Sequence, residues 1–213
     1  MKKILTPICV LAFSFSVFAQ PFNLGKVSFA TEQTWTIGSQ TWSDAVQAEN
    51  CSNKTTFNGR SSNYIDYLVD CRSNPNQKGD LFSWQAVYEL RNELCPAPWR
   101  VPTLQDFIDL DIALGGTGEY QNYNPEHRDK YLNVWGGTYG GGVDGDENHL
   151  RGQGSSASYW SQSQYANFSS VMGHYLHFYA TKYVYGRPID YVDPQMPALK
   201  HSGFSLRCVR DKK

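Results

Sequence analysis

Residues 79–103 read GDLFSWQAVYELRNELCPAPWRVPT and predict an amphipathic helix that stops abruptly. We expect the helix to begin at Asp80, its N-cap, and to end near Glu93. Pro96 and Pro98 then prevent its continuation. The apolar side chains share one helical stripe, formed by Phe82, Ala86, Val87, Leu90 and Leu94. This stripe should face the core of the protein.

A second helix is predicted directly after this stretch. The Thr103 hydroxyl can accept a hydrogen bond from the backbone N–H of Asp106, and the pair Gly115-Gly116 ends the element. Strand-like runs occur elsewhere in the chain, at 35–37, 40–42, 64–69, 157–161, 171–185 and 203–209. The first two flank a turn at Gly38-Ser39. The sequence therefore predicts one domain of two helices and several short strands.

The N-terminus has the pattern of a signal peptide, residues 1–19. Lys2 and Lys3 precede a mostly apolar segment, 4–18, and Ala19 provides a small residue at the cleavage position. The apolar segment is too short for a good membrane span. We therefore expect an exported protein of the periplasm, cell surface or extracellular space, with no membrane span. After the signal peptide we expect a leader segment over 20–34 and then a single domain over 35–211.

The mature chain carries little net charge. Its signal segment holds two of the 19 Lys and Arg residues, so about 17 basic residues face 20 acidic ones, a charge of about −3. This balance argues against nucleic acid or an anionic membrane as the main partner.

Four of the five cysteines remain after removal of Cys9 with the signal segment: Cys51, Cys71, Cys95 and Cys208. An even number in an exported chain favours two disulfides, for which three connectivities exist. We favour Cys51–Cys71, which closes a local loop, and Cys95–Cys208, which joins the first helix to the last strand. The competing interpretation, four thiols with a metal or catalytic role, fits less well because their spacing matches no zinc pattern.

Residues 115–154 are rich in Gly, Asn, Tyr and Asp and predict a long irregular loop region. Asp144, Asp146 and Asn148 place oxygen ligands at alternate positions, which suits calcium. His149 and Ser155 stand where an EF-hand needs glycine and glutamate, and the lectin-type ligand triplet is absent. The alternative is an acidic, solvated loop tip.

Aromatic residues also gather in this region. Trp135, Tyr139 and Tyr123 are the candidate ligand-binding side chains, since tyrosine and tryptophan offer flat apolar faces with polar edges. The alternative is that they fill a core short of aliphatic residues. For Trp84 and Trp99, inside the motif blocks, we expect core packing.

Five blocks resemble one known family. They are IGSQTW (37–42), GDLFSWQAV (79–87), CPAPWRVPT (95–103), YWSQS (159–163) and GFSLRCVRD (203–211). Together they resemble the Fibrobacter succinogenes major paralogous domain of exported bacterial proteins. The resemblance implies a fold of the α+β class that is similar to the C-type lectin-like fold: two helices packed on a twisted antiparallel sheet, with a long irregular loop region. It also implies the Cys95–Cys208 bridge. The segment SDAVQAENC and the Cys51–Cys71 loop depart from the family pattern.

No catalytic motif is recognisable: the chain has no serine elbow, zinc-protease helix or phosphate loop. His174 and His177 invite a metal interpretation, but positions three apart in a strand face opposite sides. For Arg100 we expect a structural hydrogen bond to backbone carbonyls rather than anion binding. We therefore predict a non-catalytic binding or adhesion module that contacts carbohydrate or a surface protein through 115–154. The alternatives are a structural or assembly subunit of a cell-surface or outer-membrane complex and, less well supported, a hydrolase using Asp144 and Glu147.

Overall fold

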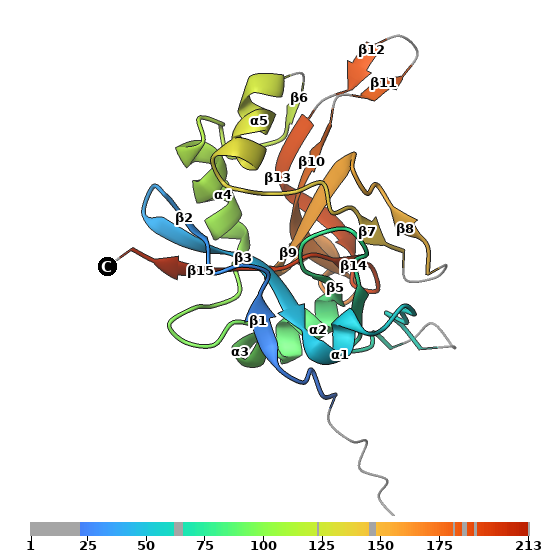
Figure 1. Cartoon of the computed structure of the whole chain (residues 1–213). Helices are drawn as coiled ribbons and strands as arrows, with labels where there is room; N and C mark the ends of the chain where they lie inside the picture. The colour runs from blue at the N-terminus through green and yellow to red at the C-terminus, as the bar shows by residue number, and fades with distance from the viewer. Residues whose placement is uncertain are drawn as a thin grey trace, which may run out of the picture.

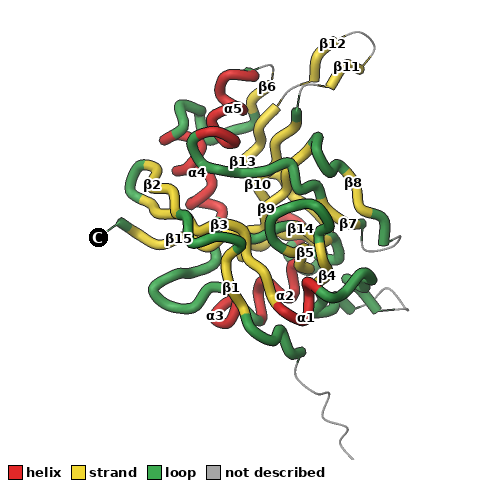
Figure 2. The backbone as a smooth tube through the Cα atoms, in the orientation of Figure 1, coloured by secondary structure: helices red, strands yellow, loops and turns green. Residues whose placement is uncertain are grey.

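The computed structural model describes residues 22–61, 66–122, 124–144, 148–180, 182–184, 187–189 and 191–212. The predicted signal peptide, 1–19, lies outside these residues. Figure 2 shows that strands occupy the middle of the molecule, while the helices form two groups at opposite ends. Within the described residues, the strands form two four-stranded sheets, one five-stranded sheet and one two-stranded hairpin.

The first sheet is organised around β3 (Gln40–Ala48). This strand pairs antiparallel with β1 (Val27–Phe29), β2 (Thr34–Ile37) and the C-terminal strand β15 (Arg207–Asp211). The β2–β3 turn contains Gly38 at a φ of +58°, a conformation that glycine adopts without strain. The predicted pair of strands around Gly38-Ser39 is confirmed, and the second strand is longer than its sequence pattern indicated.

The second sheet has the order β6 (Gln121–Asn122), β13 (Tyr191–Leu199), β10 (Met172–Tyr179) and β9 (Ser156–Gln164). All of its pairings are antiparallel. Figure 1 shows β9, β10 and β13 running between the two groups of helices.

The third sheet joins short strands from distant parts of the chain. Its order is β4 (Cys71–Ser73), β5 (Asp80–Ser83), β14 (Gly203–Phe204), β7 (Gly142–Val143) and β8 (Leu150–Arg151). A separate hairpin follows β10 and consists of β11 (Lys182–Val184) and β12 (Arg187–Ile189). The C-terminal run predicted as one strand is therefore two, because β14 belongs to this sheet and β15 to the first.

Five α-helices and a 3-10 turn, η1 (Ala166–Phe168), complete the described part. One group contains α1 (Glu49–Ser52), α2 (Trp84–Glu89) and α3 (Arg91–Leu94), and the other contains α4 (Leu104–Ala113) and α5 (Pro125–Asn133) (Figure 1). Each group covers its own apolar core. The first core includes Trp84, Val87, Leu94 and Trp160, and the second includes Trp42, Phe107, Trp135 and Phe178.

The first predicted helix begins in the wrong place. Asp80 does not cap it but lies in β5, and its buried carboxylate accepts hydrogen bonds from the Ala48 N–H and the Ser52 hydroxyl, both 2.8–2.9 Å away. Ser83 caps α2 instead, because its hydroxyl accepts from the Ala86 N–H. The long-range bonds of Asp80 prevail over its local capping preference.

The second predicted helix is confirmed at its start. Thr103 and Asp106 form a reciprocal capping box at the N-terminus of α4. The helix ends just before Gly115, whose φ is +92°.

The region 115–154 is less irregular than predicted because it contains α5. Asn124 caps this helix through a hydrogen bond from the His127 N–H, and Pro125 occupies its first turn. The predicted strand at 64–69 is also wrong for the residues described there, which form only an isolated bridge between Arg60 and Tyr67.

These findings correct the predicted fold class. A C-type lectin-like α+β arrangement, with two helices packed on one twisted sheet, is contradicted. The strands are divided among several sheets and the helices between two separate cores. The physical reason lies in the short strands β4, β5, β7, β8 and β14, which pair with one another rather than extending a single sheet.

Both predicted disulfides are present. Cys51 is bonded to Cys71, and Cys95 to Cys208. No helix in the described residues is long and apolar enough to cross a membrane.

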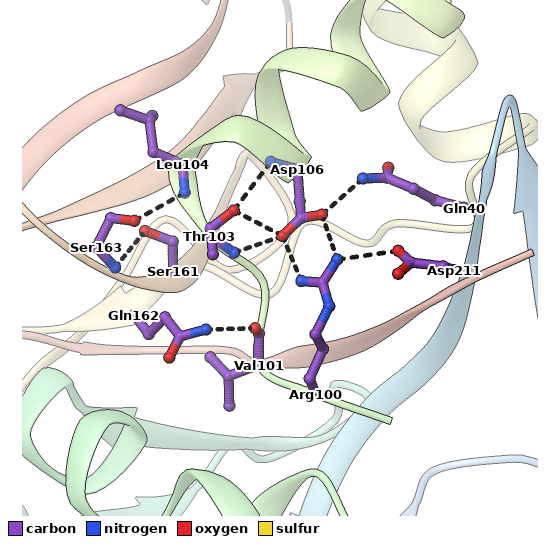
Figure 3. Close-up of polar contacts among 10 residues, drawn as sticks. All are labelled: Gln40, Arg100, Val101, Thr103, Leu104, Asp106, Ser161, Gln162, Ser163 and Asp211. Carbon is purple, nitrogen blue, oxygen red and sulfur yellow. Dashed lines mark hydrogen bonds and ion pairs between the residues drawn. The ribbon is translucent and has the colours of Figure 1, made fainter. Parts of the chain in front are cut away.

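The buried carboxylate of Asp106 holds the WRVPT block, residues 99–103, in place through hydrogen bonds (Figure 3). Arg100 donates two hydrogen bonds to this carboxylate, at 2.6 and 2.8 Å, and the Thr103 N–H and Gln40 amide donate at 2.7 Å. Arg100 also reaches Asp211 on β15 at 3.2 Å. Its role is structural, as expected, but its partners are carboxylates.

Candidate functional site

A cleft of about 770 Å³ lies on the outer face of the second sheet. Side chains alternate along β10: Leu176 and Phe178 pack into the core, whereas Tyr175, His177 and Tyr179 line the cleft. Tyr191, on the neighbouring strand β13, continues this aromatic wall. Tyr175 also packs against Trp160 and Phe204 of the first core, so the cleft face of β10 is open mainly at Tyr179.

The rest of the lining comes from the third sheet and from the start of β9, where Ser156 and Ser158 pair directly with Tyr179 and His177 of β10. Figure 1 shows β7 and β8 beside β9. These elements contribute small and polar lining residues: Gly142, Val143, Asp144, Arg151, Gly152, Ser155, Ser156 and Ser158. Part of the region 115–154 therefore does line a cavity, through its short strands.

The accessible rings of the aromatic wall are Tyr179 and Tyr191. Both are partly exposed, whereas Tyr175 is buried. The ring centroids of Tyr179 and Tyr191 are 4.9 Å apart at 67°, and the His177 ring lies 4.6 Å from Tyr179. Edge-to-face contacts of this kind hold each ring in a fixed orientation. The wall is therefore ordered before any ligand arrives.

Two phenol groups of this wall, those of Tyr175 and Tyr191, are uncharged. Burial, reinforced by the neighbouring Tyr179, raises the pKa of both Tyr175 and Tyr191 well above the ordinary tyrosine value. They therefore keep their protons and can act as hydrogen-bond donors across the physiological pH range.

Ser158 and His177 form a polar pair in the floor of the cleft. The Ser158 hydroxyl lies 2.9 Å from Nδ1 of His177. Burial lowers the pKa of His177 to about 4, so its imidazole is neutral at physiological pH. Such a low pKa makes it a weak general base. We therefore interpret the pair as a neutral hydrogen-bonding group.

This burial of His177 predicts a pH-dependent stability. Between about pH 6.5 and pH 4, the unfolded chain binds a proton at His177 that the folded chain does not bind. The free energy of unfolding should therefore fall as the pH falls through this window, by about 3 kcal/mol at most. Urea unfolding at pH 7 and pH 4.5 measures the loss.

The variant His177→Gln should lose much less stability between these two pH values. Equal losses in both proteins would show that His177 is not the group responsible. An NMR titration of the His177 ring in the wild-type protein gives an independent measurement.

The structure places the predicted ligand-binding aromatics elsewhere. Trp135 is fully buried, with its ring 5.5 Å from Trp42 and 5.0 Å from Tyr159. Tyr139 is partly buried and packs against Phe178. Tyr123 lies outside the described residues. For Trp135, the interpretation as a core residue is the one that fits.

The predicted calcium ligands are not gathered in the described part of the chain. Asp144 lines the cleft, 3.9 Å from Nε2 of His201. The Asn148 side chain accepts a hydrogen bond from the Phe57 backbone N–H, so its oxygen is already engaged. Asp146 lies outside the described residues. Among the residues described, no cluster of three or more His, Cys, Asp or Glu side chains could hold a metal, and calcium binding stays a prediction.

The two histidines are separated as expected for a strand. His177 faces the cleft, whereas Nδ1 of His174 donates a hydrogen bond to the Gln195 carbonyl oxygen at 2.9 Å.

The tyrosines of the cleft were not predicted from the sequence. The alternation in YLHFY at 175–179 was a usable signal for Tyr175 and Tyr179. Tyr191 gave little signal, because Pro194 and Pro197 argue against a strand there.

The match to a known family covers most of the chain. The sequence profile of the Fibrobacter succinogenes major domain matches residues 36–210. The chain belongs to this family. The span of the Fibrobacter succinogenes major domain runs from β2 into β15 and includes every residue that lines the cleft. No curated protein and no solved structure matches the chain.

Proposed function

We propose that this protein is an exported, non-catalytic binding module that holds a carbohydrate in the cleft between β10, β13 and β7. The observation that supports this most is the pair of partly exposed tyrosines, Tyr179 and Tyr191, in a cleft that serine residues also line. A sugar ring has apolar C–H faces and a hydroxyl-bearing edge. The cleft offers a partner for each.

The size of the cleft agrees with this proposal. Its volume of about 770 Å³ lies within the range of about 300–1,000 Å³ typical of small-ligand sites. Aromatic faces supply apolar contact at a low cost in side-chain entropy, since a tyrosine has only two rotatable side-chain torsions. Ordered rings reduce the entropic cost of binding further.

Export is the second part of the proposal. The two disulfides are consistent with an oxidising compartment, and the signal-peptide pattern at 1–19 points the same way. The place of action would be the periplasm, the cell surface or the extracellular space, where polysaccharides are abundant ligands.

The test is binding of the oxidised protein to a broad panel of glycans, followed by titration of each ligand found. Tyr191→Ala and Tyr179→Ala should each weaken binding about ten-fold or more, because each removes one stacking surface. Tyr88→Ala is the matched control: Tyr88 is 40% exposed on α2, outside the cleft. It should bind like the wild type.

Two outcomes would contradict the proposal. The first is absence of binding to any glycan by a folded protein, which would favour a protein partner or a subunit role in a surface complex. The second is a loss of binding in Tyr88→Ala with no loss in the two cleft variants. Thermal unfolding of each variant separates loss of binding from loss of folding.

A further inference from the structure

We infer that the ligand of this cleft is an uncharged saccharide, recognised by ring stacking and hydroxyl hydrogen bonds rather than by charge. This inference rests on the proposed function and narrows it. It excludes uronic acid, sialic acid and sulfated sugars as the main ligands.

The charges that line the cleft cancel. Among the described lining residues, the side chains charged at neutral pH are Asp144 and Arg151, one of each sign. Protein sites for carboxylates and sulfates are typically built on arginine forks or clusters of basic groups. Here a single exposed arginine shares the cleft with a carboxylate that would repel an anionic sugar. The lining therefore gives no net preference for an anion.

The floor of the cleft disfavours any buried ionic group. Tyr175 and His177 are 7% and 6% exposed, and both are uncharged at neutral pH. A carboxylate placed against them would lose its water without gaining an ionic partner, which is strongly unfavourable. A hydroxyl group loses far less hydration free energy on the same transfer, and one or two hydrogen bonds can compensate that loss.

The polar groups of the cleft suit hydroxyls in particular. The serine hydroxyls, including Ser158, both donate and accept hydrogen bonds. The neutral His177 ring has one donor and one acceptor nitrogen, of which Nδ1 is engaged with Ser158. Sugar hydroxyls have the same dual character, so each can be satisfied in either direction. A carboxylate or sulfate can only accept hydrogen bonds. The acceptor groups of the serine hydroxyls and of the His177 ring would then have no donor from the ligand.

The experiment compares neutral and anionic saccharides directly. The full mature protein is titrated calorimetrically with neutral oligosaccharides of glucose, mannose, galactose and xylose, and with oligogalacturonides, sialyllactose and sulfated galactans. Oligogalacturonides are used both as methyl esters and as free acids, a pair that differs mainly in charge. We expect the strongest ligands to be neutral. Their affinity should change by less than about two-fold between roughly 0.05 and 0.5 M NaCl.

Two variants separate the modes of recognition. Arg151→Ala should leave the affinity for a neutral saccharide within about two-fold of the wild type, because an uncharged ligand forms no ion pair with the guanidinium. Ser158→Ala should weaken binding by about five-fold or more, because it removes a hydroxyl partner together with its hydrogen bond to Nδ1 of His177. Tyr88→Ala again serves as the control.

These experiments distinguish failure of the inference from failure of the proposed function. Preferred binding of an anionic saccharide that weakens with salt and is lost in Arg151→Ala would overturn the inference, while the proposed function would survive. Absence of binding to every saccharide would overturn both. Neutral binding that is insensitive to salt and to Arg151→Ala, and weakened by Ser158→Ala, would support the inference.

Discussion

Replacing both Cys95 and Cys208 by alanine is expected to lower the free energy of unfolding by about 5 kcal/mol. The bridge closes a loop of 113 residues, the longer of the two disulfide loops. Without it the unfolded chain gains the conformational freedom of that loop, and the contact between the end of α3 and β15 must form without a tether. Unfolding in guanidinium chloride, compared with the wild type, measures the loss.

The matched control is the double variant of the other bridge, Cys51→Ala with Cys71→Ala. Its loop spans 20 residues, so the expected loss is about 3 kcal/mol. All four cysteines are buried, and the cavities left by alanine are therefore comparable. A loss for the Cys95–Cys208 variant equal to or smaller than that of the control would contradict the account of β15 as the strand that the long bridge holds in place.

Replacing Asp106 by alanine is the second large effect, with an expected loss of about 3 kcal/mol. Its carboxylate is nearly buried and accepts hydrogen bonds from Arg100, Thr103 and Gln40. Removal leaves these donors without their partner and also removes half of the capping box of α4. The Arg100 side chain is 40% exposed, so we expect less than the 3–5 kcal/mol typical of wholly buried pairs.

The control for Asp106→Ala is Asp211→Ala. The Asp211 carboxylate also contacts Arg100, but its side chain is 80% exposed. Its replacement should cost less than about 1 kcal/mol, as exposed ion pairs do. Urea unfolding at pH 7 measures both losses. Equal losses would contradict the account in which the Asp106 carboxylate holds Arg100, Thr103 and Gln40 together (Figure 3).

Asp106 also contributes to the loss of stability in acid. Burial alone would raise its pKa, but hydrogen bonds from Arg100 and Thr103 outweigh burial and lower the pKa below the ordinary aspartate value. Its stabilising contribution is therefore complete above about pH 4 and is lost as the pH falls further. In Asp106→Ala this part of the acid dependence should be absent.

The sequence was informative where the structure is decided locally. The Thr103 cap of α4 and the turn at Gly38-Ser39 are local arrangements, and both were predicted, although the return bond from the Thr103 N–H to the Asp106 carboxylate was not. The two disulfides were the favoured one of three connectivities, and the family resemblance also implied Cys95–Cys208. In these cases the residues that interact either lie close in sequence or belong to a small set of possible pairs.

The sequence was misleading where distant partners decide the structure. Asp80 resembles a helix cap, yet Ala48 and Ser52 engage its carboxylate and leave it in β5. Pro125 after Asn124 is a helix-start signal that the glycine-rich composition of the region concealed. The division of strands among several sheets depends on pairings across the whole chain, which no local pattern encodes.

The cleft was missed for the same reason. The alternation in YLHFY at 175–179 separates the two faces of β10, but neither it nor the sequence around Trp135 shows which rings the rest of the chain covers. Trp135 is buried because the Arg207 guanidinium lies 4.2 Å above its ring and Trp42 packs against its side. Tyr179 faces the cleft because Phe178, its neighbour on β10, takes the core position.

The measurement that tests the central claim most directly is an NMR titration of the protein with tyrosine rings labelled. The ligand is the strongest binder from the glycan panel. The account predicts that the ring signals of Tyr179 and Tyr191 shift with the ligand, whereas that of Tyr88 on α2 does not. Shifts at Tyr88 with unchanged signals from Tyr179 and Tyr191 would contradict it, because the ligand would then bind outside the cleft.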